Sequence, residues 1–208
     1  METILKTAPA VEPISLDEAK RHLRIDIDET DHDDYLQDLI VVARQQVEMI
    51  TWRKLVTQTW TAYLPDWPSG NYIELPFGEL YSVTPEVIDG VSGIKYASND
   101  IDATTGLFTT YAWVSTEYVV DTDYQLGRIV LVDGYTWPNE TLSPTNPIEI
   151  VFICGYGLAA DVPPQIKHAM KMIMSELFEN REVSIIGTIQ KEMDTVNNLL
   201  SNFRLNEL

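Results

Sequence analysis

The spacing of hydrophobic residues changes twice along this chain, and that change constrains the fold more than any other feature. Apolar residues recur at helical spacing up to about residue 55, alternate as in strands to about residue 153, and then return to helical spacing. Short strands separated by turn residues favour an antiparallel sheet over a parallel sheet with crossover helices. The sequence therefore predicts an α+β fold, with a mainly α-helical base and an inserted antiparallel β domain.

These spacings divide the chain into three segments. We expect residues 1–55 to form an N-terminal helical part, residues 56–153 the inserted β domain, and residues 154–208 a C-terminal helical part. Because helical segments flank the insertion on both sides, we expect residues 154–208 to pack on residues 1–55.

Local signals predict where several helices begin and end. Ser15 and Glu18 have the spacing of a capping box, in which each side chain accepts a hydrogen bond from the other residue's backbone N–H. A longer helix is expected to begin near Asp31 and to end near Trp52. A further helix should start at Pro164, because proline suits the first helical position.

The middle of the chain alternates as a half-buried strand does. Trp60, Ala62 and Leu64 fall on one face of a predicted strand, and Ile148, Ile150 and Phe152 fall on one face of another. Cys154, which is the single cysteine, ends this second apolar run, so we expect it to be buried and unable to form an internal disulfide.

Composition argues against several classes of function. The chain has 32 acidic and 14 basic residues, a formal net charge of −18, and no dense cluster of Lys and Arg. Proteins that read nucleic acids normally neutralise phosphates with such clusters, so specific DNA binding is disfavoured. The chain also has no run of about 18 apolar residues and no basic-flanked leader, which predicts a soluble protein made in the cytoplasm and no membrane partner.

Motifs that could carry chemistry are incomplete. Aligned to a calcium-binding loop from Asp26, the sixth position is Asp31 instead of Gly, and the twelfth is Gln37 instead of Glu. Gly155 and Gly157 lack the third glycine of a phosphate-binding loop, so we interpret them as a corner between a strand and a helix. The three histidines are widely scattered, and we expect no metal or cofactor.

No catalytic signature appears, so we do not expect an enzyme. Two alternatives remain open. In a chain this acidic, an unrecognised pair of carboxylates could serve a hydrolase. The net charge of −18 could also belong to an acidic inhibitor that mimics DNA.

Aromatic residues crowd the β zone, several of them beside Pro or Gly in predicted loops. Aromatic side chains dominate the anchors of protein–protein interfaces, although packing within the sheet is the alternative explanation. The candidates for a subunit or tail interface are Trp67, Phe77, Tyr135 and Trp137.

An ordered set of short motifs carries a resemblance to a known family. The motifs are Ile14–Arg24, an acidic loop and long helix, Leu55–Trp60, Gly127–Ile129, Phe152–Gly157, Val162–Lys167 and Glu179–Glu182. In this order they resemble the head–tail connector (adaptor) proteins of tailed phages and of related gene-transfer particles. The resemblance covers about residues 13 to 204. The chain departs from the family's pattern in having a longer β zone over residues 89–117 and in being acidic.

The resemblance implies a structural role in the neck of a virion. It implies a homo-oligomeric ring of about twelve copies, bound under the portal protein and followed by a tail or head-completion (stopper) protein. Genomic DNA would pass through the ring without specific binding. The family has no active site, so no catalytic residues are transferred to this chain.

Two segments are candidates for these contacts. The C-terminal segment carries apolar residues that could dock on the portal, or could instead pack on the chain's own helices: Leu199, Leu200, Phe203 and Leu205. An acidic wall would repel DNA phosphates at short range. The candidates for such a wall, unless this loop faces outward, are Asp26, Asp28, Glu29, Asp31, Asp33 and Asp34.

Overall fold

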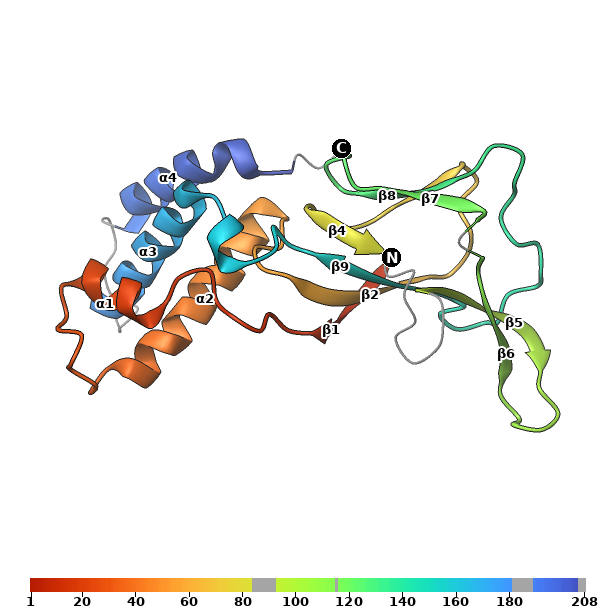
Figure 1. Cartoon of the computed structure of the whole chain (residues 1–208), viewed down its shortest axis with the longest axis horizontal. Helices are drawn as coiled ribbons and strands as arrows, with labels where there is room; N and C mark the ends of the chain where they lie inside the picture. Colours follow the sequence, from red (N-terminus) through yellow and green to blue (C-terminus); the bar gives the residue numbers. More distant parts are fainter. Residues whose placement is uncertain (84–92, 115, 181–188, 206–208) are drawn as a thin grey trace. The chain divides into compact units, whose positions relative to one another are not determined.

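A computed structural model describes residues 1–83, 93–114, 116–180 and 189–205 (Figure 1). The chain divides into two compact units. The first, which we call the strand unit, comprises Met1–Ala8 and Thr57–Gly155, and the second, the helical unit, comprises Pro9–Val56 and Tyr156–Leu208. Helices and antiparallel sheets together confirm the predicted α+β class.

The helical unit contains four α-helices and two short 3-10 turns among the described residues. They are α1 (Leu16–Leu23), α2 (Asp33–Thr51), η1 (Ala159–Asp161), α3 (Pro164–Glu179), α4 (Ile189–Leu200) and η2 (Ser201–Phe203). The predicted capping box is present, because the Glu18 N–H donates to Ser15 Oγ at 3.2 Å and the Ser15 N–H donates to the Glu18 carboxylate at 3.0 Å. The start of α3 at Pro164 is likewise confirmed.

The apolar faces of these helices meet in one core. Ala43 and Val47 of α2, Met170 of α3 and Leu200 of α4 are fully buried there. The helical spacing seen in the sequence thus corresponds to burial on facing sides of α2, α3 and α4.

The strand unit contains nine strands among the described residues, and every pairing is antiparallel. They are β1 (Glu2–Thr7), β2 (Gln58–Leu64), β3 (Tyr72–Glu74), β4 (Leu80–Val83), β5 (Ile94–Ile101), β6 (Phe108–Ala112), β7 (Tyr118–Asp121), β8 (Arg128–Leu131) and β9 (Ile148–Cys154). The larger sheet has the order β1-β2-β9-β5-β6, with β4 also paired to β9, and the smaller has the order β3-β8-β7.

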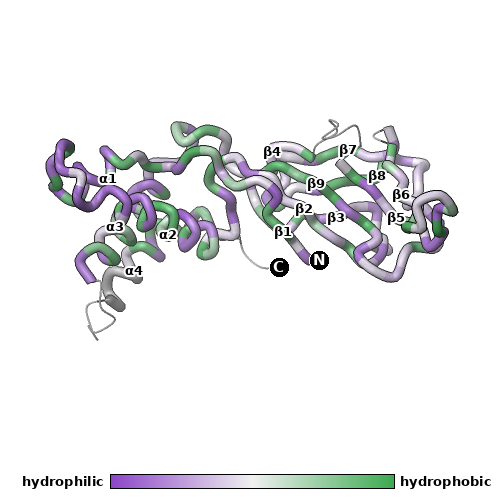
Figure 2. Tube along the Cα trace, turned by 90° about the horizontal axis from the view of Figure 1, so that it is seen from below, coloured by the Kyte–Doolittle hydropathy of each residue, from purple (hydrophilic) through white to green (hydrophobic). Residues whose placement is uncertain are grey.

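Strand β9 is the centre of the larger sheet. It pairs with β2 along one edge and with β5 and β4 along the other, and hydrophobic residues run along it in Figure 2. Ile148, Ile150, Phe152 and Cys154 are fully buried on its core face, which confirms the alternation predicted for this strand and the burial of the cysteine.

Strand β1 was not predicted, and it places residues 1–8 in the strand unit although the sequence suggested a helical part beginning at residue 1. Its residues pair with β2 in the register Glu2 to Tyr63 and Ile4 to Thr61. Five of its six residues are exposed, so the strand has no buried face to impose an alternating pattern on the sequence.

Glycines shape two connections. Gly127 has a φ of +67°, and a Cβ at this position would lie within 2.5 Å of the Leu80 side chain, so a larger residue would not fit between β7 and β8. Gly155 and Gly157 have φ values of +123° and +115° where the chain leaves β9 before η1, which is the corner predicted from the sequence. No described helix is long and apolar enough to cross a membrane.

Candidate interaction surfaces

The acidic loop between α1 and α2 is organised by one buried cation. Lys20 is only 2% exposed, and its Nζ donates to the carbonyl oxygens of Ile27 at 3.0 Å and Glu29 at 2.6 Å. The same ammonium forms an ion pair with Asp33 in the first turn of α2. A buried ammonium is costly unless it is paired and hydrogen-bonded, so the loop and the lysine stabilise one another.

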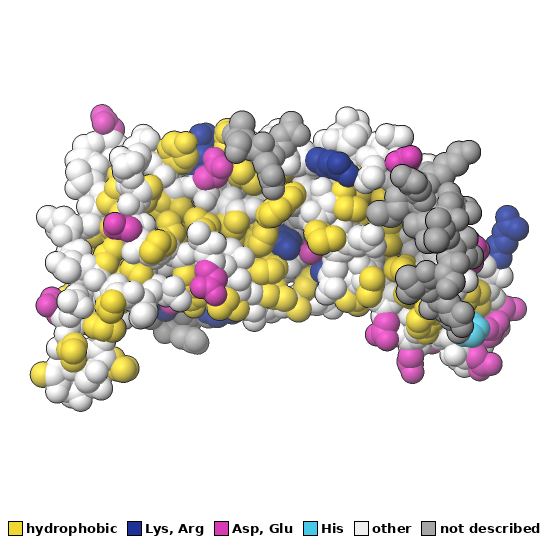
Figure 3. Space-filling model, turned by 180° about the vertical axis from the view of Figure 1, so that it is seen from behind, with side chains coloured by type: hydrophobic (Ala, Val, Ile, Leu, Met, Phe, Trp, Pro, Cys, Tyr) yellow, Lys and Arg dark blue, Asp and Glu magenta, His cyan; other side chains and the backbone are white. Residues whose placement is uncertain are grey.

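The six acidic residues proposed to face DNA therefore do not form one equivalent set. Asp33 is paired internally with Lys20. Asp26 accepts a hydrogen bond from the Asp28 N–H at 3.2 Å, which shapes the turn. All five of these acids other than Asp33 are exposed, and acidic side chains gather at this end of the helical unit in Figure 3. Five exposed carboxylates of the loop are thus available to repel a polyanion.

The C-terminal segment is held by its own unit. Leu200 is fully buried and Leu205 is 6% exposed, whereas Leu199 and Phe203 are partly buried against the same core. The Leu205 N–H donates to the carbonyl oxygen of Thr51 at 3.1 Å, and Arg53 Nε donates to the carbonyl oxygen of Phe203 at 2.7 Å. This geometry favours packing on the chain's own helices for Leu200 and Leu205.

Two of the four aromatic candidates belong to a cluster of rings. Trp67 stacks on Trp137 with ring centroids 5.2 Å apart and planes 11° from parallel, and it makes edge contacts with Tyr96 and Trp113. Trp113 is 2% exposed, and its indole N–H donates to Glu117 at 2.8 Å. Such a cluster buries apolar surface and orders the loops that carry Trp67 and Trp137.

The other two aromatic candidates have different surroundings. Phe77 contacts Trp60 and Phe152, with ring centroids 4.7 and 6.2 Å apart, so its ring packs onto the core of the strand unit. Tyr135 is 48% exposed. Of the four candidates, Tyr135 offers a partner the most accessible ring, because the others have ring neighbours within the chain.

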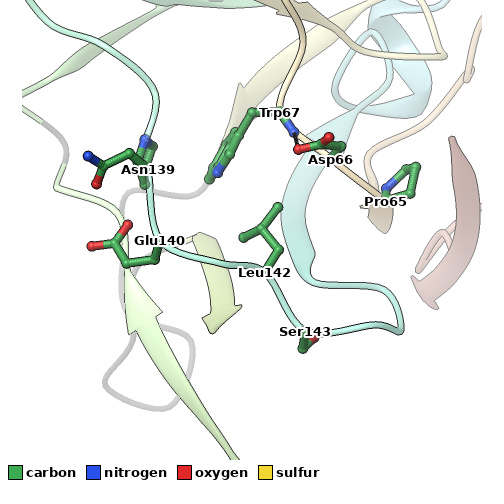
Figure 4. Close-up of a pocket in the computed structure, with 8 residues that line it drawn as sticks. Pro65, Asp66, Trp67, Asn139, Glu140, Leu142 and Ser143 are labelled. Atoms are coloured by element: carbon green, nitrogen blue, oxygen red, sulfur yellow. Dashed lines mark hydrogen bonds between the residues drawn. The ribbon is translucent and has the colours of Figure 1, made fainter. Parts of the chain in front are cut away.

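A pocket of about 410 Å³ lies beside the aromatic cluster (Figure 4). Its walls include Trp67, Leu142 and the carboxylates of Asp66 and Glu140. In Figure 4 the Trp67 ring and Leu142 lie between Asp66 on one side and Glu140 on the other. Asp66 also accepts a hydrogen bond from the Trp67 N–H at 2.8 Å, so this carboxylate has a structural partner in its own turn. The pocket therefore does not present two carboxylates facing one another.

Neighbouring groups lower the pKa of three carboxylates: Glu18, Asp102 and Asp121. A hydrogen bond from the Ser15 N–H, together with Lys171, lowers the pKa of Glu18. The N–H groups of Thr105 and Thr104 lower the pKa of Asp102, and the Arg128 guanidinium, 2.9 Å away, lowers that of Asp121. A carboxylic acid that donates a proton in catalysis needs the opposite shift. No group of three or more metal-binding side chains occurs in the parts of the chain that the structure describes.

The strand unit also carries a set of exposed apolar side chains that the sequence did not predict. Ile101 is 65% exposed and Leu107 is 70% exposed, at the end of the hairpin that β5 and β6 form. Figure 3 shows hydrophobic side chains on this projecting end. The sequence could have revealed these residues, because Ile101 and Leu107 flank a turn, where polar residues are usual. The alternation of a half-buried strand does not explain them.

Comparison of the sequence with known families gives one match. The model of the phage gp6-like head-tail connector protein family matches residues 13–112. These residues run from just before α1 to the end of β6. No curated protein matches the chain.

Comparison of the fold with solved structures gives matches over the whole chain. A chain in the neck of an empty gene transfer agent particle, computed with C6 symmetry, matches with a TM-score of 0.78 at 20% identity, covering 100% of this chain and 97% of that chain. A chain in the virion of a native gene transfer agent particle matches with a TM-score of 0.73 at 21% identity, with the same coverage of both chains.

A third match comes from the neck of a native particle computed with C12 symmetry. Its TM-score is 0.66 at 19% identity, and it covers 99% of this chain and 97% of that chain. The resemblance to head–tail connector proteins that the sequence indicated is therefore confirmed: residues 13–112 match that family's model, and the whole chain has the fold of chains in gene transfer agent particles.

Proposed function

We propose that this chain is a structural subunit of a virion neck, and that about twelve copies form a ring below the portal protein and continue the DNA channel towards the tail. The observation that carries the proposal is the match of residues 13–112 to the head-tail connector family, together with a fold shared over the whole chain with neck structures. The ring's other partner is a tail or head-completion protein, and the protein is made in the host cytoplasm before it enters the virion.

The charge of the chain suits a channel through which DNA passes without being held. The exposed carboxylates of the loop between α1 and α2 repel phosphates at distances up to the screening length, which is about 8–10 Å at physiological salt. We place this loop on the lumen side of the ring. Asp33 contributes to the shape of the loop through Lys20, and the remaining acids contribute to the repulsion.

Contact with the portal is proposed for the C-terminal segment, through the side chains that its own core covers only in part. Those are Leu199 and Phe203, because Leu200 and Leu205 are already buried. Contact with a neighbouring subunit or a tail protein is proposed for Tyr135 and for the rim of the aromatic cluster at Trp67 and Trp137.

The proposal is tested by native mass spectrometry of the purified chain, alone and mixed with the portal protein encoded by the same genome. We expect a ring, or a complex in which a ring of the chain is bound to the portal ring. A strict monomer that ignores the portal would contradict the proposal. If that monomer also hydrolysed a glycoside or nucleotide, or bound a DNA-binding protein in place of DNA, the corresponding alternative would replace it.

A further inference from the structure

The larger sheet of the strand unit has two outer edges, and both are open in the described part of the chain. Strand β1 pairs only with β2, and β6 pairs only with β5, so the sheet begins and ends with strands that have one neighbour each. An open edge exposes a row of backbone N–H and C=O groups that can pair with a further strand. Proteins usually protect such edges with proline, charge or a covering segment.

Among the described residues these protections are sparse, since the charged side chains on the two edge strands are limited to Glu2 and Lys6 of β1. Strands β1 and β6 contain no proline, and most of their side chains are exposed. Apolar residues are among them: Ile4 and Leu5 of β1 are 52% and 42% exposed, and Phe108 and Tyr111 of β6 are 37% and 40% exposed. Apolar edge strands that no further strand covers are expected to pair with another chain.

The charges of the two edges favour a second copy of this chain as the partner. In a protein with a net charge of −18, copies repel one another wherever acidic surfaces meet. Strand β6 has no charged residue, and β1 has one acidic and one basic residue, Glu2 and Lys6, so its net charge is zero. The two edges are therefore surfaces over which two copies can approach without that repulsion.

The directions of the strands determine how the edges can meet. Each step along β1, β2, β9, β5 and β6 is antiparallel, and four such steps leave β1 and β6 running in the same direction. A rotated copy placed beside the first therefore brings its β1 parallel to the first copy's β6. The two edges differ from one another, so this contact is head-to-tail, which is the type that generates rings.

We propose that β6 of one copy pairs in parallel with β1 of the next copy, so that the larger sheets join into one continuous sheet around the ring. The proposal rests on the proposed function, because it specifies how subunits of the neck ring contact each other. Five strands at about 4.8 Å spacing give each copy an arc of about 24 Å. Twelve copies would then close at a circumference of about 290 Å and a radius of about 46 Å, which leaves the centre of the ring open.

Disulfide trapping tests the pairing in the full-length chain. The natural cysteine, Cys154, is fully buried, so introduced cysteines report on the edges alone. Thr110→Cys on β6 is combined in turn with Thr3→Cys, Ile4→Cys and Leu5→Cys on β1, because the register between copies is set by the contact itself. The ring is assembled, oxidised mildly and run on a non-reducing gel.

We expect a ladder of covalent multimers that extends to the full ring for at least one of the three combinations. The matched control pairs Thr110→Cys with Thr122→Cys, an exposed position between β7 and β8 that lies outside either edge, and should give no such ladder. Intact rings by native mass spectrometry without a ladder above the control in any combination would overturn the edge pairing and leave the proposed function standing. The absence of rings in the unmodified protein, alone and with portal, would overturn both.

Discussion

Lys20 illustrates how one residue can determine the shape of a loop that carries most of the local charge. Its Nζ is bound by two backbone carbonyls and by Asp33 inside the helical unit. Replacing it as Lys20→Met would leave those carbonyls and the partly buried carboxylate without their donor. We expect the free energy of unfolding, measured by urea titration, to fall by about 3 kcal/mol.

Lys171→Met is the matched control for this prediction. Lys171 pairs with Glu18 at 3.4 Å, but the Glu18 side chain is 40% exposed and the pair lies at the surface. Surface pairs contribute about 0–1 kcal/mol, so this variant should remain close to the wild type. If the two variants lost the same unfolding free energy, the burial of Lys20 would not make its ion pair more stabilising than a surface pair.

Glu18 provides a second prediction at the scale of the residue, concerning pH. Its pKa is lowered from the ordinary value of 4.5, chiefly by the hydrogen bond from the Ser15 N–H. A carboxylate whose pKa is lower in the folded state contributes stability above its unfolded pKa, and that contribution is lost as the pH falls through the folded value. Glu18→Gln should therefore lose less unfolding free energy than the wild type between about pH 5 and pH 3.

Glutamine suits this experiment because its side-chain oxygen can still accept the Ser15 N–H in the capping box. The control is Asp17→Asn, which removes an exposed carboxylate from the same turn of α1 without changing the box. If Asp17→Asn flattened the acid limb of the stability curve as much as Glu18→Gln, the effect would come from net charge and not from the box.

At the scale of the element, the C-terminal segment combines a structural role with a proposed docking role. Leu200→Ala should lower the free energy of unfolding by about 2–5 kcal/mol, because the residue is fully buried and the cavity left behind adds to the lost burial. Leu199→Ala should cost less, since that side chain is partly exposed. Urea unfolding followed by circular dichroism distinguishes the two variants.

Portal binding separates the two roles of this segment. We expect Leu199→Ala and Phe203→Ala to weaken binding of the portal in a pull-down while the protein stays folded. Truncation after Asn202 should instead destabilise the helical unit, because it removes buried Leu205 and the carbonyl that Arg53 binds. Unchanged portal binding in folded Leu199→Ala and Phe203→Ala proteins would assign this segment to internal packing alone.

At the scale of the whole molecule, the acidic loop is expected to speed the passage of DNA. The variant Asp28→Asn, Asp31→Asn and Asp34→Asn removes three exposed charges and leaves the Lys20–Asp33 pair in place. DNA ejection from assembled particles should be slower than in the wild type at low salt. The difference should shrink at high salt, because screening then acts over about 3 Å at 1 M.

A second triple variant controls for net charge. Asp100→Asn, Asp123→Asn and Asp133→Asn remove the same number of exposed carboxylates from the strand unit. We expect this variant to eject DNA at the wild-type rate. Equal slowing in both variants would mean that total charge governs passage, and an unchanged rate in the loop variant at low salt would place the loop outside the lumen.

Features that depend on neighbours in the sequence were predictable from it. The capping box at Ser15 and Glu18, the start of α3 at Pro164 and the alternation along β9 all follow from hydrogen bonds, steric limits or side-chain spacing within a few residues. The fold class follows from the same spacing, because apolar residues at helical spacing indicate a helix with one buried face and alternating apolar residues indicate a strand with one buried face. The family resemblance likewise rests on motifs of adjacent residues.

Other features required the tertiary structure because they depend on residues far apart in the chain. Strand β1 has no buried face, so only its pairing with β2 reveals it. The amphipathic C-terminal segment could cover its own helices or a partner, and the burial of Leu200 and Leu205 favours its own core for those two residues. In the sequence Lys20 resembles a surface lysine, and only the structure shows that it is buried and bound by the loop between α1 and α2. Periodicity in a sequence predicts that a face will be covered, but the identity of the covering residues is decided by the packing of the whole chain.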